Sequence, residues 1–365
     1  IYAPYLITQA DFVALHNSAY IGRYDILKEL KPNGIFLLNS EWDNSEVFSH
    51  LTRDMQEKII RDNIKFFNIN ALAIANKVGL GNRINTVMQA AFFIVSDVLP
   101  QKEAITLIKE TIVKSYKAKG EHIVAMNHAA VDQAKDALSL VKVPKSLADI
   151  DSAFEPPVLI SENAGNYAKN IIENIMHLHG DDIPVSHMPL DGKVPTNTAR
   201  LEKRGIAPYV PRWIKENCIQ CNQCSLVCPH AAIRAKQIDP KELGDAPKSF
   251  ETLKSNTKND RDLQFKIQIY TEDCTGCGNC IDVCPAKTKA LEFKPIAEER
   301  ERGENENTNF FDSLSDNVVD GVPAGTYKAT QFLKPLFEFS GACAGCGETP
   351  YVKLLSQLFG ERMLV

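Results

Sequence analysis

Two runs of cysteine are the residues of this sequence whose type and spacing best suit metal and redox chemistry. The first run is Cys218, Cys221, Cys224 and Cys228, with a proline directly after it. The second run is Cys274, Cys277, Cys280 and Cys284, again with a proline directly after it. Thiolates are the protein ligands that soft metals and iron–sulfur clusters select, so the repeat predicts a metal-binding segment.

The spacing of each run is C-x2-C-x2-C-x3-C-P, which is the pattern with which bacterial ferredoxins hold [4Fe–4S] clusters. Three thiolates two residues apart can bind three corners of one cubane, and the fourth cysteine reaches the other cluster. The pattern therefore predicts two interlocked ligand sets. One set is Cys218, Cys221, Cys224 and Cys284, and the other is Cys274, Cys277, Cys280 and Cys228.

Zinc is the alternative occupant of such cysteines. Structural zinc sites use well-separated pairs in a tetrahedron, where a third cysteine at the same two-residue step has no purpose. Two complete copies of the longer pattern favour clusters, and with them the transfer of single electrons.

A third pair, Cys343 and Cys346, is less specific. A single C-x-x-C can be a redox pair, half of a zinc site or half of a cluster site. Thr349 as an N-cap and Pro350 at the first helical position predict a helix over 350–359, directly after this pair. Any further ligands of such a site would lie outside residues 1–365.

Composition excludes several classes of function. The net charge of −5 and the lack of a basic cluster argue against nucleic-acid binding. The longest apolar stretches, such as 90–95, are too short to cross a membrane. All ten cysteines lie between positions 218 and 346 and no export signal opens the chain, which indicates a reducing cytoplasm. The first residue is Ile1, and we expect a central piece of a longer polypeptide.

The first 185 residues alternate strand-like and helix-like patterns, which predicts a parallel α/β sheet with helices on both faces. The expected strands are 12–16, 34–39 and 64–70, and the expected helices are 20–30, 85–98, 102–119 and 121–141, with a turn at 32–34. Neither a GxGxxG nor a Walker-type loop occurs in the sequence, so no nucleotide site follows from motifs.

The length of 365 residues suits about two or three domains. We expect the α/β domain over 1–185, a linker over 186–215 with a helix before it at 166–179, and a two-cluster domain over 216–300. Within the last, residues 263–269 alternate as a half-buried strand does, and 291–293 repeat that pattern briefly. The acidic residues 296–330 are expected to form an exposed connection, with 301–330 as a second linker before a further domain begins at 331.

Several segments together resemble the pyruvate:ferredoxin (flavodoxin) oxidoreductase family, whose members are thiamine diphosphate-dependent 2-oxoacid oxidoreductases. The resemblance covers the whole chain. Its specific markers are the double cysteine motif and the segments 341–351 (GACAGCGETPY), 201–206 (LEKRGI) and 79–89 (GLGNRINTVMQ).

The resemblance implies an α/β domain, a bacterial two-[4Fe–4S] ferredoxin-like domain and the start of a thiamine-binding domain over 331–365. It further implies oxidation of pyruvate to acetyl-coenzyme A and CO2 by the full-length protein, with thiamine diphosphate and Mg as cofactors. Three [4Fe–4S] clusters would pass electrons to ferredoxin or flavodoxin, and the full-length protein would be a homodimer. The 365 residues alone are not expected to turn over pyruvate, and we assign no catalytic residue to them.

In that family scheme Cys343 and Cys346 are two ligands of the cluster nearest to thiamine, and Glu348 lies in the thiamine diphosphate pocket. A carboxylate is also favoured near a helix N-terminus for electrostatic reasons, which is the alternative for Glu348. Asn85 and Asn127 match positions that contact coenzyme A. The alternative is that Asn85 caps a helix and Asn127 is a satisfied amide on a helix face.

Two other functions remain open from the sequence. The first is a stand-alone polyferredoxin-type electron carrier, which would have no use for the third cysteine pair. The second is a related oxidoreductase for another 2-oxoacid.

Overall fold

The computed structural model describes residues 7–146, 148, 154, 160, 164–258 and 261–364. They divide into two compact units, one within residues 1–158 and 170–183, the other within 159–169 and 184–365. No described helix is both long enough and apolar enough to cross a membrane.

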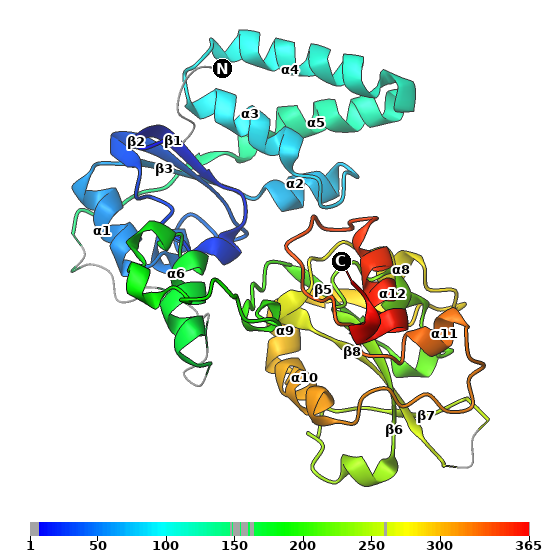
Figure 1. Ribbon diagram of the computed structural model, residues 1–365. Coiled ribbons are helices and arrows are strands. Elements are labelled where there is room, and N and C mark those ends of the chain that lie inside the picture. The colour runs from blue at the N-terminus through cyan, green and yellow to red at the C-terminus, as the bar shows by residue number, and fades with distance from the viewer. Residues whose placement is uncertain are drawn as a thin grey trace. The chain divides into compact units, whose positions relative to one another are not determined.

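The first unit contains a sheet in the order β1-β2-β3-β4 (Figure 1). Strands β1 (Ala10–Leu15), β2 (Leu30–Asn39) and β3 (Lys65–Ile69) are parallel, as predicted. A short antiparallel strand, β4 (Ser139–Leu140), pairs with β3 where we expected the end of a helix. The predicted turn at 32–34 is an irregularity inside β2, where Asn33 adopts a positive φ of 62°.

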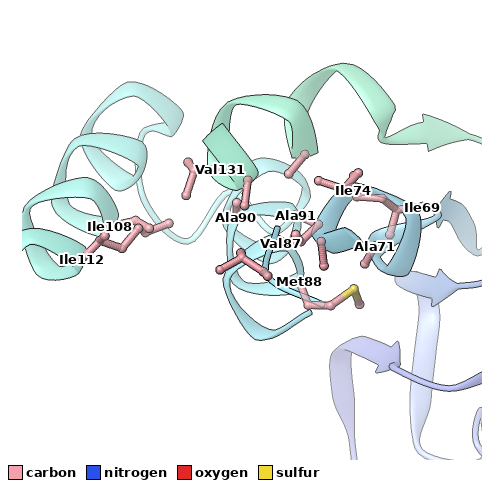
Figure 2. Packing of buried hydrophobic residues seen from close by; sticks show 14 of the residues in the cluster. Ile69, Ala71, Ile74, Val87, Met88, Ala90, Ala91, Ile108, Ile112 and Val131 are labelled. Carbon is pink, nitrogen blue, oxygen red and sulfur yellow. The ribbon is translucent and has the colours of Figure 1, made fainter. Parts of the chain in front are cut away.

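Each face of this sheet carries its own core. Phe36 and Phe66 stack at 5.1 Å on the face covered by α1 (Arg53–Arg61). The opposite face, which includes Leu37 and Ile69, packs against the four helices that follow β3. Figure 2 shows part of that second core, in which alanines such as Ala90 and Ala91 let the helices approach closely. Helices therefore cover both faces, as the buried runs of the strands predicted.

The four helices of the second core are α2 (Ala71–Lys77), α3 (Asn85–Val95), α4 (Gln101–Tyr116) and α5 (Glu121–Ala137). The last three confirm predicted helices within a few residues at their ends. The helix predicted over 20–30 is wrong, because the chain there forms a 3-10 turn at Ser18–Tyr20 and then further turns. Gly22 adopts a φ of 75°, which no right-handed helix accommodates.

The described residues between β4 and β5 are mostly irregular. The predicted helix near 166–179 is present as a π-helical stretch, Ala168–Ile172, followed by α6 (Glu173–Met176). Residues 149–153, 155–159 and 161–163 of the polar stretch before it lie outside the described residues. The expected linker ends in a strand that we did not predict, β5 (Tyr209–Trp213).

The second unit is built on two small antiparallel sheets (Figure 1). In one, β5 pairs with β9 (Leu291–Pro295), and in the other β8 (Gln264–Ile269) pairs with both β6 (Ile233–Ile238) and β7 (Leu253–Lys254). Two short helices, α7 (Gln223–Val227) and α8 (Asn279–Asp282), each begin inside a cysteine run. The fold thus repeats a cysteine loop, a short helix and a strand.

The expectation of an exposed acidic connection after 296 is wrong for its first part. Residues there form α9 (Ile296–Glu301) and α10 (Glu304–Ser313), and Glu304 is only 5% exposed. Its carboxylate accepts a hydrogen bond from Gln268 Nε2 at 2.7 Å and another from Asn307 Nδ2 at 2.9 Å. A buried carboxylate is tolerated when such partners replace water, which the composition of the segment could not reveal.

The same contacts correct the prediction for β8. Its alternating pattern suggested one solvated face, yet both Lys266 and Gln268 are buried. The Lys266 ammonium lies 4.7 Å from the Phe250 ring, so aromatic side chains cover that face. The unit ends with α11 (Tyr327–Thr330) and α12 (Thr349–Phe359), the latter confirming the helix predicted after the third cysteine pair.

Candidate metal centre

The two cysteine runs adopt the same backbone conformation at matching positions. In the first run Gln220 and Asn222 have φ values of 57° and 62°. In the second run Gly276 and Gly278, at the equivalent positions, have φ values of 68° and 86°. These left-handed residues turn the chain around each central cysteine, so that all three cysteines of a run face the same side.

Side-chain hydrogen bonds hold the left-handed residues of the first run. Gln220 Nε2 donates to Lys254 O at 2.8 Å, and Gln220 Oε1 accepts from Asn256 N at 2.9 Å. Asn222 Nδ2 donates to Lys328 O at 3.0 Å. The first loop is therefore tied to neighbouring chain segments.

One cavity is lined by thiols from both runs. Cys218, Cys221 and Cys224 share it with Cys284, the last cysteine of the other run. Burial raises the pKa of Cys218 and of Cys224, and in both cases the neighbouring Cys221 and Cys284 raise it further. The fold thus brings together the first predicted set.

The second set is assembled in the same crossed way. Burial raises the pKa of Cys274 to about 12, with Cys228 and Cys277 as further causes. Cys228 also raises the pKa of Cys277 and of Cys280. The fourth cysteine of each run therefore lies among the first three cysteines of the other run.

The crowding and burial of these thiols favour the binding of a metal. All ten cysteines are free, and crowding and burial oppose their ionisation unless a cation replaces the protons. Backbone amides face the sulfurs: Gly276 N donates to Cys274 Sγ at 3.4 Å and Ala290 N to Cys284 Sγ at 3.5 Å. Such amides stabilise the negative charge of a cluster.

Two observations test whether a cubane fits. The indole Nε1 of Trp213 is buried and belongs to a residue that lines the cavity of the first set, and its hydrogen bond to Cys218 partly offsets the rise that burial causes in the pKa of that thiol. A cluster sulfur in this cavity could accept from the same N–H. Among the described residues, no three His, Cys, Asp or Glu side chains are spaced to hold a single metal ion. Two sets of four thiols match the ligand number of a [4Fe–4S] cubane.

The third pair lies beside the second set. An added Cβ on Gly345 would be 3.5 Å from Cys277 Cβ, and a hydrogen bond from the Gly345 backbone partly offsets the rise that burial causes in the pKa of Cys277. Backbone amides of Thr349 and Glu348 lower the pKa of Cys346. Cys343 is exposed. The pair therefore sits at the start of α12, next to one cubane site.

Comparison with known proteins agrees with this geometry along most of the chain. Residues 1–137 match the family model described as pyruvate ferredoxin/flavodoxin oxidoreductase, 153–207 a domain of unknown function, and 217–288 a 4Fe–4S dicluster domain. The chain is 51% identical over 365 residues to a pyruvate:ferredoxin oxidoreductase of Moorella thermoacetica, covering 100% of this chain and 31% of that protein.

The chain belongs to the pyruvate ferredoxin/flavodoxin oxidoreductase family. A putative pyruvate-flavodoxin oxidoreductase of Synechocystis is 43% identical, and a probable pyruvate-flavodoxin oxidoreductase of Escherichia coli is 41% identical. Each alignment covers 100% of this chain and 31% of the relative, so the chain spans about a third of their length. The predicted order of a parallel-sheet domain and a ferredoxin-like domain is confirmed.

Among solved structures, a pyruvate oxidoreductase subunit PORC of Thermotoga maritima aligns with a TM-score of 0.30 and 19% identity, covering 37% of this chain and 67% of that one. So low a similarity carries no argument about this chain.

Two residues that resemble coenzyme A contacts of the family lie in different settings. Asn85 is the exposed first residue of α3, which has Ile84 as its N-cap, so Asn85 does not cap the helix. Asn127 is 4% exposed. Its Oδ1 accepts from Thr86 Oγ1 at 2.9 Å and its Nδ2 donates to Ile123 O at 2.9 Å, so its amide already has partners in the fold.

Glu348 is exposed and is itself the N-cap residue of α12, although its side chain makes no capping hydrogen bond. The helix therefore begins at Thr349, one residue before the predicted start. Sequence reasoning missed two groups near the thiols, the Trp213 indole and the ammonium of Lys353. Neither lies in a recognisable motif, and only the tertiary packing brings them there.

Proposed function

We propose that this chain is the electron-relay and coenzyme A-side part of an enzyme that oxidises pyruvate to acetyl-coenzyme A and CO2. The observation that carries the proposal is the crossed arrangement of the two thiol sets, with a third thiol pair beside one of them. Cys218, Cys221, Cys224 and Cys284 would hold one [4Fe–4S] cluster. Cys274, Cys277, Cys280 and Cys228 would hold the second.

The positions of the thiols suggest the direction of electron flow. Cys343 and Cys346 would provide two ligands of a third cluster, and this pair adjoins Cys277 of the second set. Burial, and with it the nearby Cys228, Cys274 and Cys224, raises the pKa of Cys280, so the two complete sets adjoin as well. Electrons would therefore pass from the third cluster through the second set to the first set.

Single-electron carriers are required because a two-electron oxidation must be matched to acceptors that take one electron at a time. When bound, thiamine diphosphate with Mg supplies the carbanion chemistry that releases CO2 from a 2-oxoacid. Glu348, exposed beside Cys346 in the sequence, is the residue of this chain that we assign to its pocket. Asn85 is exposed and could contact coenzyme A, whereas Asn127 would act by holding α3 and α5 together.

The names of the relatives support ferredoxin or flavodoxin as the acceptor of the electrons. From the family resemblance we further propose that the full-length protein is a homodimer, and a reducing cytoplasm would keep the thiols available for iron. The competing function of a simple electron carrier gives no role to Cys343 and Cys346.

An anaerobic assay of the purified full-length protein tests this function. Reduction of a low-potential ferredoxin should require pyruvate and coenzyme A together. Reduction that needs another 2-oxoacid in place of pyruvate would assign the related oxidoreductase. A cluster-loaded protein that exchanges electrons but never responds to any 2-oxoacid would be a carrier, and our proposal would be wrong.

A further inference from the structure

The ammonium of Lys353 is buried between the two thiol sets. Lys353 lies on α12, the helix that follows the third cysteine pair, and is only 1% exposed. Its Nζ donates to Ser225 O, to Leu226 O at 3.0 Å and to Cys228 O at 3.2 Å. A lysine side chain is rarely buried to this extent unless the fold uses its charge.

The three carbonyl groups belong to the end of α7 and to the residue after it. This short helix connects Cys224, a member of the first thiol set, with Cys228, a member of the second. One ammonium group therefore contacts the backbone that joins the two sets. Because the last carbonyls of a helix carry partial negative charge, a cation is stabilised at this position.

The contacts of Lys353 indicate which groups its charge can serve. Among the described residues, its ammonium has carbonyl partners and no carboxylate, and these carbonyls lie on the segment that joins Cys224 to Cys228. Three carbonyl acceptors match the three donors of a protonated ammonium group. A buried cation without a carboxylate normally needs another anion.

We propose that Lys353 is a positioning residue whose buried positive charge stabilises the reduced forms of both [4Fe–4S] clusters. This inference rests on the proposed function only in requiring that the two thiol sets hold clusters. Reduction adds one electron to each cluster and thus one negative charge, with no bond made or broken and no proton transferred. Lys353 favours the added charge at both clusters because it lies between the segments that bind them.

Lys236 provides a matched control in the same unit. Its Nζ is also buried and also donates to carbonyls at a helix end, Phe311 O at 2.9 Å and Leu314 O at 2.7 Å after α10. In contrast to Lys353, it forms an ion pair with Asp316 at 2.9 Å, and no cysteine is among the groups that shift its pKa. The two lysines share a structural role but differ in their nearness to the thiols.

The experiment is an EPR-monitored redox titration of the anaerobically purified protein carrying K353Q, K353R, K353M or K236Q. K353Q keeps hydrogen-bond donors for the carbonyls but loses the charge. We expect it to lower the midpoint potentials of both clusters, with an about tenfold smaller ratio of reduced to oxidised cluster at a fixed potential, or 59 mV for one electron. K353R should stay near the wild type, and K236Q should leave both potentials unchanged.

K353M removes both the charge and the hydrogen-bond donors, so comparing it with K353Q separates the effect of the charge from that of the hydrogen bonds to the carbonyls. Potentials lowered equally in K353Q and K353M, with lower thermal stability in K353M alone, would support the electrostatic role. Wild-type potentials in a cluster-loaded K353Q would overturn it. So would loss of clusters in K353Q with clusters retained in K236Q, since Lys353 would then serve folding alone. Absence of clusters from the wild type would instead refute the proposed function.

Discussion

The two cysteine runs reach one backbone shape by different chemistry. The second run uses Gly276 and Gly278 where the chain must be left-handed. The first run places Gln220 and Asn222 in the same conformation, at a cost of about 1 kcal/mol or more for each residue. Hydrogen bonds from their side chains offset that cost. The same loop conformation can therefore be reached with glycine or with polar residues whose side chains are held by hydrogen bonds.

The difference also reflects the space around each loop. An added Cβ on Gly276 would lie 3.2 Å from both Ala207 Cβ and Tyr209 O, so the backbone of another segment closes that position. Gln220, by contrast, extends toward Lys254 and Asn256. The second loop is held by close backbone packing, and the first by side-chain bonds.

The largest effect is expected when the fourth cysteine of each run is replaced by serine, one at a time. C284S should abolish the cluster held by the first run, and C228S the cluster held by the second, each with a loss of about four irons per chain. Iron analysis together with EPR of the remaining reduced cluster would identify which site is lost. If C228S removed the cluster of its own run instead, the crossed arrangement would be wrong.

The next effect tests the close packing of the second loop. G276A should destabilise the cluster-loaded protein by about 2–4 kcal/mol, because it adds left-handed strain to a steric overlap with the chain at Ala207. Denaturant-induced loss of the visible cluster absorbance would measure this change. G278A is a suitable comparison, since the nearest atoms there are Phe293 ring carbons at 3.6 Å. An effect of G276A no larger than that of G278A would contradict the packing argument.

A smaller effect is expected when the first loop is given the chemistry of the second. Q220G removes two hydrogen bonds but also relieves the left-handed strain, so the net destabilisation should be about 1 kcal/mol or less. Q220A loses the same bonds without relieving the strain and should cost more. The same denaturation assay applies. Equal destabilisation by Q220G and Q220A would show that left-handed strain at position 220 does not contribute to the stability of the loop.

The smallest effect concerns one cluster only. W213F removes the indole N–H that donates to Cys218 of the first thiol set. The potential of that cluster should fall by tens of millivolts, since a tenfold change corresponds to 59 mV for one electron. The cluster of the second run serves as the internal control in the same redox titration, and an equal shift of both would count against a local hydrogen bond.

Cysteine spacing predicted two crossed sets, and the structure places Cys284 in one cavity with Cys218, Cys221 and Cys224; their role as cluster ligands stays a prediction. The buried runs around Phe36 and Phe66 likewise predicted the parallel sheet. The helix expected over 20–30 failed because the spacing of Leu27 and Leu30 reports burial, which turns can also provide. Gly22 was the available signal against it.

Other features depend on contacts between distant segments and could not be predicted. Glu304 looked like part of a solvated acidic run until Gln268 from β8 was seen to pair with it. On α12 the apolar Tyr351 and Leu355 are exposed while Lys353 is buried, which is the reverse of what hydropathy suggests. The role of Lys353 follows only from its position between the thiol sets.

Iron and acid-labile sulfide in the anaerobically purified protein test the central claim most directly. Two cubanes in this segment predict at least about eight atoms of each per chain. Stoichiometric zinc without labile sulfide would contradict the account, because the eight thiolates would then serve structure and could not carry electrons.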